Sequence, residues 1–139
     1  MRACLAALPV LLVATSFSDA RAGAAAATLP KEAAQALHSA TQVELYSLEP
    51  WFDDDTKEPK WHELVVLGHT TLKADKAKAA VAQVEAAIKA GAGKSAACVE
   101  PRQGVRAESG GHAYDFLLSY DCHSLVVYID DKKVATLPA

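Results

Sequence analysis

The chain has 139 residues, with 14 basic and 17 acidic side chains and a net charge of −3 at pH 7. This length suits one domain with a single core. The mildly acidic balance, with lysines dispersed along the chain, disfavours nucleic acid and anionic membrane surfaces as partners, because both attract clustered basic side chains. We therefore expect a protein or small-molecule partner of unknown identity, and no nucleic acid.

The N-terminus has the pattern of a signal peptide. A basic start is followed by an apolar run over residues 3–15, and Ala20-Arg21-Ala22 offers the small residues that signal peptidase selects. The run is shorter than the about 20 residues of a membrane-spanning helix, and no later segment approaches that length. We predict a signal peptide over 1–22, a disordered alanine-rich junction over 23–29, and a periplasmic or secreted domain over 30–139.

The domain is predicted to open with a helix and a strand. Pro30 suits the first turn of a short helix that runs to about Ser39. Polar and apolar residues alternate over 42–48, which predicts a strand. Residues 49–60 hold two prolines and the triplet Asp53-Asp54-Asp55, a composition typical of an exposed loop.

A second strand and a second helix are expected next. An apolar run within residues 62–72 predicts a strand more buried than the first. Asp75 can cap the helix that follows, in which apolar residues recur on one face. Gly91 and Gly93 are expected to end it.

The remainder is predicted to be β-rich. Gly110-Gly111 and the stretch Asp130 to Lys133 indicate tight turns between successive strands. The expected strands cover residues 105–108, 114–120, 125–129 and 134–137. Short links make neighbouring strands antiparallel, so the sequence predicts an α+β domain with one antiparallel sheet of four to six strands packed against two helices.

The cysteines point to a disulfide. Cys4 lies in the leader, which leaves Cys98 and Cys122 as an even pair in a compartment where thiols are normally oxidised. A bridge that closes a loop of about 25 residues would stabilise the fold by roughly 3 to 4 kcal/mol. We predict that Cys98 and Cys122 are bonded and that the bridge is structural.

A metal or redox site is the alternative use of the same region. Cys98 and Cys122, with His112 and His123, are ligand types that zinc or copper would accept. Their spacing matches none of the common zinc-finger patterns, and an oxidised cysteine pair cannot bind metal as thiolates. We expect no cofactor, and whether the cysteines are bridged or free decides between the two interpretations.

Arginine, proline and glycine are concentrated in a candidate binding loop. Its residues are Pro101, Arg102, Gln103, Gly104 and Arg106. The two arginines could clamp a carboxylate or phosphate group. The other interpretation, which we prefer, is that they pair with Glu100, Glu108 or Asp115 and stiffen the loop.

Other features are less specific. The acidic triplet at 53–55 lacks the spacing of a calcium loop, so a solvated loop is the simpler interpretation. Trp51, Phe52 and Trp61 could present an aromatic surface to a partner or cover an edge of the core. The sequence contains no Gly-x-Ser-x-Gly elbow, His-Glu-x-x-His helix or phosphate-binding glycine loop. His62 is expected at the surface.

Several runs resemble a family of uncharacterised exported bacterial proteins. They are LYSLEP at 45–50, WHELVVLG at 61–68, ACVEPRQGVR at 97–106 and YDCHSL at 120–125. The family has a Cys-x-x-Pro-Arg-His-Gly-Ile-Arg loop followed by a strand that ends in Cys-Phe-x-Cys, and this chain is similar to it at both places. This chain has Gln103 and Ser119 at two of those positions. The resemblance implies no activity, and the departures favour a disulfide over a metal site.

Together these features predict an exported, non-enzymatic binding or structural domain. In this hypothesis, the bridge holds the loop from Pro101 to Arg106 beside the last hairpin, where its surface contacts a partner. The metal-binding or redox protein remains the alternative.

Overall fold

The computed structural model of the protein describes residues 28–51, 57–92, 94 and 98–139. The predicted signal peptide, most of the junction after it, Phe52 and the triplet at 53–55 lie outside the described residues. The described residues form two helices and seven strands. These are α1 (Lys31–Ser39), β1 (Gln42–Glu49), β2 (Lys60–Trp61), β3 (Leu64–Lys73), α2 (Asp75–Gly91), β4 (Gln103–Ser109), β5 (His112–Ser119), β6 (Ser124–Ile129) and β7 (Lys132–Pro138).

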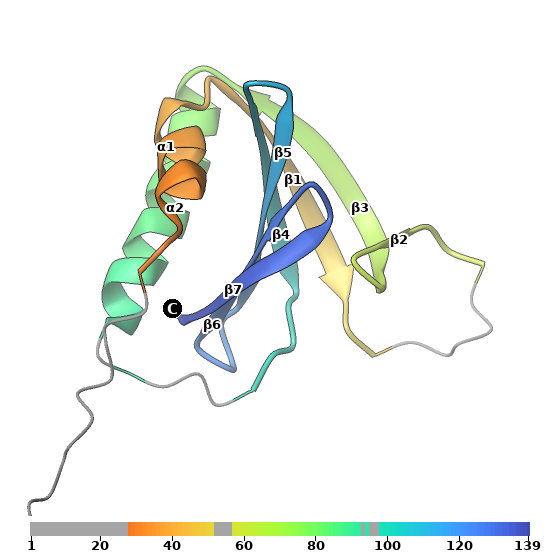
Figure 1. The fold of residues 1–139 in the computed structure, drawn as a ribbon. Coiled ribbons are helices and arrows are strands. Elements are labelled where there is room, and N and C mark those ends of the chain that lie inside the picture. The colour runs from red at the N-terminus through yellow and green to blue at the C-terminus, as the bar shows by residue number, and fades with distance from the viewer. Residues whose placement is uncertain (1–27, 52–56, 93, 95–97) are drawn as a thin grey trace, which may run out of the picture.

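All seven strands belong to one antiparallel sheet in the order β2-β3-β1-β4-β5-β6-β7. The sheet is strongly curled into a half-barrel, and both helices lie on its inner side (Figure 1). The predicted α+β class and the two helices are confirmed. The predicted count of four to six strands is too low by one, because β2 is two residues long and lies in a segment whose prolines indicate a loop.

Both helices begin and end close to the predicted positions, and each buries a stripe of small or branched residues. Ala33, Ala36 and Leu37 of α1 recur at helical spacing and are buried against the sheet. The predicted cap of α2 is wrong. The helix begins at Asp75 itself, no side chain caps it, and Ala74 precedes it with φ 50°. The Asp75 carboxylate still lies in the first turn, where it interacts favourably with the helix dipole.

The sheet has apolar residues on both faces. Successive residues of a strand point to opposite sides, so Phe116 of β5 faces the helices and Leu117 faces away from them. The main core between helices and sheet contains Ala33, Ala36, Leu37, Val43, Ala77, Val81, Val84, Val105, Ala107, Tyr114, Phe116, Leu118, Leu125, Val127 and Leu137. The smaller outer core contains Leu48, Leu117 and Val126, with Tyr46, Trp61, Leu64, Val66 and Tyr128 packed against it.

The candidate binding loop is shorter than predicted. β4 begins at Gln103, so Gln103, Gly104 and Arg106 are strand residues, and the backbone of Arg102 before them is held by hydrogen bonds. The backbone N–H of Arg102 donates to Leu118, and its carbonyl accepts from Leu48. Among the described helices, none is long and apolar enough to cross a bilayer.

Candidate functional site

The predicted disulfide between Cys98 and Cys122 is confirmed. The two Cα atoms are 4.8 Å apart and 24 positions apart in the chain. Cys122 is buried and Cys98 is exposed. The bridge ties the segment before β4 to the turn after β5, and a hydrogen bond from the Glu100 N–H to Ser119 Oγ (3.3 Å) adds to this link.

The four residues of the metal alternative do not come together. His112 begins β5, whereas Cys122 follows the end of that strand, so the full length of β5 separates them. His112 Nδ1 lies 2.6 Å from Asp130 Oδ2, and this hydrogen bond lowers the pKa of Asp130. His123 lies in the turn after Cys122 with φ 50°. Both cysteine sulfurs are used in the bridge and are not available as thiolates.

A charged cluster that the sequence only partly indicated lies on the outer face of the sheet. Asp115 is 0% exposed and accepts two hydrogen bonds of 2.7 Å from Arg106, one to each carboxylate oxygen. His62 Nε2 donates to Oδ2 of the same carboxylate, also at 2.7 Å. The preferred interpretation of Arg106, that it pairs with an acidic residue, is therefore confirmed for Asp115. The surface position predicted for His62 is wrong, because its side chain is 4% exposed.

This cluster shifts the pKa values of its members. Burial alone would raise the pKa of Asp115, but the hydrogen bonds from Arg106 and His62 outweigh it and hold that pKa below its usual value. The hydrogen bond to Asp115 in turn raises the pKa of Arg106. Burial, together with a 2.6 Å hydrogen bond to Glu44, raises the pKa of Tyr46 to about 12.

Aromatic rings fix the position of His62. The hairpin between β2 and β3 turns at His62 and Glu63 with φ 50° and 66°, a left-handed pair typical of a tight two-residue turn. The His62 ring stacks on Tyr128 at 3.8 Å and packs against Trp61 at 4.8 Å. Trp61 stacks in turn on Tyr46 at 4.1 Å. The ring of Trp61 occupies the space where a Cβ of Gly104 would lie, so only glycine fits there.

The outer cluster is therefore a structural anchor. Asp115 has both oxygens engaged, and its two partners come from β4 and from the tip of the β2–β3 hairpin. A buried charge that is fully paired in this way holds neighbouring elements in register. The three hydrogen bonds to Asp115 link β5 to β4 and to the β2–β3 hairpin.

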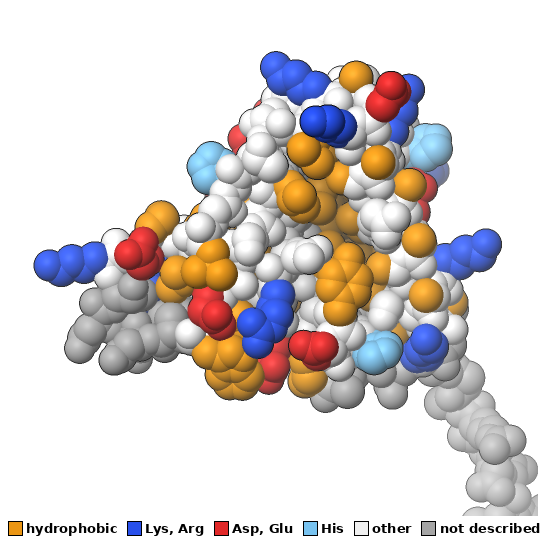
Figure 2. Space-filling view, turned by 180° about the vertical axis from the view of Figure 1, so that it is seen from behind, with side chains coloured by type: hydrophobic (Ala, Val, Ile, Leu, Met, Phe, Trp, Pro, Cys, Tyr) orange, Lys and Arg blue, Asp and Glu red, His pale blue; other side chains and the backbone are white. Residues whose placement is uncertain are grey.

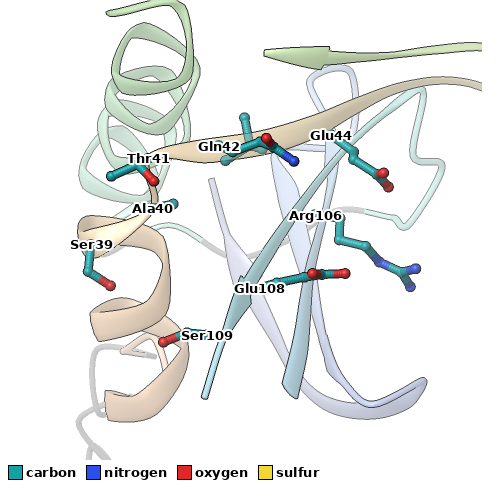
Figure 3. Close-up of a pocket in the computed structure, with 9 residues that line it drawn as sticks. Ser39, Ala40, Thr41, Gln42, Glu44, Arg106, Glu108 and Ser109 are labelled. Atoms are coloured by element: carbon teal, nitrogen blue, oxygen red, sulfur yellow. The ribbon is translucent and has the colours of Figure 1, made fainter. Parts of the chain in front are cut away.

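A polar hollow of about 310 Å³ lies where α1 meets β1. Figure 3 shows Glu44, Arg106 and Glu108 extending to the same side of the strands, with Ser39 and Ser109 toward the helix. Arg106 is already bound to Asp115, and Glu44 accepts the hydroxyl of Tyr46. Two of the charged side chains that line this hollow, Glu44 and Arg106, therefore already have hydrogen-bond partners within the protein.

An uncharged groove lies on the inner side of the sheet, beside α2. It consists of two adjoining hollows that share Leu45 and Gln103, with volumes of about 320 Å³ and about 160 Å³. Figure 2 looks onto this side and shows hydrophobic side chains at the centre of the face, bordered by polar side chains and backbone. The first hollow is lined by Leu45, Tyr46, Ser47, Gly68, His69, Thr70 and Gln103; the second by Leu45, Ala80, Gln83, Val84, Gln103, Val105, Leu118 and Tyr120.

The groove combines an apolar floor with neutral polar groups. Val105 and Leu118 are buried at its base, whereas Tyr120 is 54% exposed at its rim. Side-chain amides and hydroxyls of Gln103, Ser47 and Thr70 supply hydrogen-bonding groups. None of the lining residues is Asp, Glu, Lys or Arg. This composition matches that of small-ligand sites, which are mostly apolar with a few polar groups that fix orientation.

The predicted loop contributes one residue to the groove. Gln103 lines both hollows, whereas Gly104 and Arg106 belong to the outer cluster and Pro101 is buried. Arg102 lies 3.8 Å from Glu49 and 4.0 Å from Asp121. Sequence reasoning missed the other groove residues, because they come from four strands and a helix that are distant along the chain.

Comparison of the chain with protein-family models, with curated proteins and with solved structures finds no match. The resemblance drawn from the motifs around Cys98 and Cys122 therefore stays a prediction.

Proposed function

We propose that the protein is a non-enzymatic binding domain of an oxidising, extracytoplasmic compartment, and that it binds an uncharged ligand in the inner groove. The observation that carries this proposal is the pair of adjoining hollows whose lining contains no Asp, Glu, Lys or Arg. The disulfide supports the compartment, because such bonds persist where thiols are oxidised.

The lining favours a neutral, largely apolar ligand. Transfer of apolar surface from water to the floor formed by Leu45, Val105 and Leu118 is favourable by about 25 cal/mol per Å². A charged group placed there would lose its hydration without gaining an ionic partner. The neutral side chains at the rim can hydrogen-bond such a ligand and orient it.

Binding is favoured over catalysis by the separation of the reactive groups. General acid-base chemistry needs a proton donor or acceptor within hydrogen-bond reach of the substrate. The buried carboxylate of Asp115 lies on the outer face of the sheet and is bound to Arg106 and His62. His69 lines one hollow, but no carboxylate stands beside it in that lining.

The test is to fill the groove without disturbing the fold. A Cβ at Gly68 would meet no atom within 4 Å, so Gly68→Val should fold normally and occupy the first hollow. Thr71→Val changes an exposed residue of the same strand on the opposite face and is the matched control. The probe is Nile red, a neutral apolar dye whose fluorescence rises in apolar surroundings.

We expect the wild-type protein and Thr71→Val to bind the dye equally and Gly68→Val to bind it at least about tenfold more weakly, a difference of about 1.4 kcal/mol. Equal binding by all three proteins, with unchanged circular dichroism, would place the dye elsewhere and contradict the proposal.

A further inference from the structure

The outer edge of β3 is open beside the groove. β2 pairs with β3 only through Lys60 with Val65 and Trp61 with Leu64. The N–H of Val66 donates to the carbonyl of Pro59, which is the last hydrogen bond on that side. In the part of the chain that the structure describes, Gly68–Lys73 pairs with β1 and with no strand on its other side, and Leu67 is the extra residue at a shift in the β1–β3 register.

This edge has protective features only at its two ends, which are the register shift at Leu67 and the lysine at Lys73. Lysine and proline are the residues that most often protect an edge. Between these ends, the run from Gly68 to Leu72 contains no Pro, Lys, Arg, Asp or Glu, and residues 67–71 are all exposed. The sheet's hydrogen-bonding pattern therefore ends in a row of neutral, accessible backbone donors and acceptors.

The groove begins where this edge ends. Gly68, His69 and Thr70 line the first hollow, and the missing side chain of Gly68 leaves the space above it free. An added strand would form backbone hydrogen bonds to β3 and place alternate side chains over this hollow. Backbone pairing and side-chain binding would thus come from one ligand.

We infer that the ligand of the groove is an extended, uncharged peptide segment of about six or seven residues that adds to β3 as an eighth strand. This inference rests on the proposed function and names its ligand class. The inward side chains of the peptide are uncharged, because the lining of the hollow contains no Asp, Glu, Lys or Arg.

The dimensions of the edge favour a peptide over a second copy of the chain. The regular part of the free edge runs from Gly68 to Lys73, bounded by Pro59 at one end and by α2, which begins at Asp75, at the other. If two copies paired through antiparallel β3 strands, the end of β3 in one copy would lie beside the start of β3 in the other. The helix α2 that follows Lys73 would then meet the segment at Pro59 that already covers that start. A short peptide has no such neighbour.

The experiment uses the full chain and a neutral probe, the acetylated and amidated hexapeptide Thr-Val-Thr-Val-Thr-Val. Binding is measured by isothermal titration calorimetry. Two N-methylated isomers carry methyl groups on the backbone nitrogens of the three threonines or of the three valines. Residues whose N–H groups face one neighbouring strand alternate along a strand, so only one of these isomers can pair with β3.

Strand addition predicts that one isomer binds like the parent peptide and that the other loses at least about tenfold in affinity, since three hydrogen bonds are removed. It also predicts that Gly68→Val weakens parent binding and that Thr71→Val does not. Equal binding of both isomers, or no binding of the parent peptide, overturns the inference.

The dye experiment separates this failure from that of the proposed function. If Nile red binds in the groove but the peptide does not, the groove remains a ligand site and strand addition is wrong. If sedimentation equilibrium shows a dimer of the unliganded protein that Thr70→Lys dissociates, the edge pairs with a second copy and the peptide inference is also overturned.

Discussion

Asp115 is the only charged residue that is buried among the described residues, and its role can be tested directly. Asp115→Asn removes the charge that Arg106 and His62 both contact, and it leaves the guanidinium, whose side chain is 22% exposed, without its main partner. We expect a loss of about 2 to 4 kcal/mol in the free energy of unfolding, measured by urea titration.

Asp121→Asn is the matched control for this substitution. Its side chain is 85% exposed and lies 4.0 Å from Arg102, so the change should stay within about 0.5 kcal/mol. A loss as small for Asp115→Asn as for Asp121→Asn would show that the outer cluster does not anchor the fold.

The lowered pKa of Asp115 predicts how stability depends on pH. Between its folded pKa and its unfolded value of about 4, the unfolded chain binds more protons, so stability rises with pH there. The contribution is complete above the unfolded pKa and is lost as pH falls through the folded pKa. In urea titrations from pH 6 to about pH 2, the free energy of unfolding should fall more steeply with decreasing pH for the wild-type protein than for Asp115→Asn. Parallel curves would contradict this.

Gly104 tests the packing of the hairpin on the outer face. Gly104→Ala would place a methyl group in the ring of Trp61, and we expect the displacement to cost about 1 to 3 kcal/mol in a urea titration. Gly68→Ala is the control, because its new methyl group meets nothing within 4 Å and should be neutral or slightly stabilising. Equal effects at the two positions would contradict the close approach of Trp61 to Gly104.

At the scale of elements, the disulfide closes the open end of the hairpin formed by β4 and β5. It connects the segment before β4 with the turn that follows β5. Mild reduction, or the Cys98→Ala, Cys122→Ala double variant, should lower the free energy of unfolding by roughly 3 to 4 kcal/mol. The free energy of dye binding should change by less than the free energy of unfolding. Gln103 belongs to β4 and Tyr120 directly follows β5, so the pairing of these strands still positions both residues. An unchanged midpoint after reduction would mean that the bridge adds nothing to the fold.

Periodic elements could be predicted from the sequence, and short ones could not. The apolar stripe of α2 and the strands beside Gly110-Gly111 follow from helical or alternating patterns, which the structure reproduces within a few residues. β2 was not predicted, because a strand of two residues is too short to show an alternating pattern. The pairing of Arg106 with Asp115 was within reach, since counting outward from the glycine turn places them opposite each other.

At the scale of the whole molecule, the groove depends on the curl of the sheet. Leu45, Gly68 and Leu118 come from three strands, and α2 covers only part of the inner face, which leaves the hollows between them. No local pattern in the sequence encodes this curvature. The prediction of a binding domain therefore named the loop around Arg102, where a motif was visible, and found only Gln103 of the groove.

The disulfide and the outer cluster stabilise the parts of the fold on either side of the groove. The bridge lies near the end of the groove at Tyr120, and the cluster fixes the hairpin that bounds the free edge of β3. Both features are structural, and both lie next to the groove instead of within it.

The most direct test of the groove is an amide chemical-shift titration of the ¹⁵N-labelled protein with the neutral hexapeptide. The account predicts that the largest shifts fall on Leu45, Gly68, Thr70 and Gln103, while the hairpin at Gly110 is unchanged. Shifts confined to the outer face, around Arg106 and Tyr128, or no shifts at peptide concentrations up to about 1 mM, the range of weak specific binding, would contradict it.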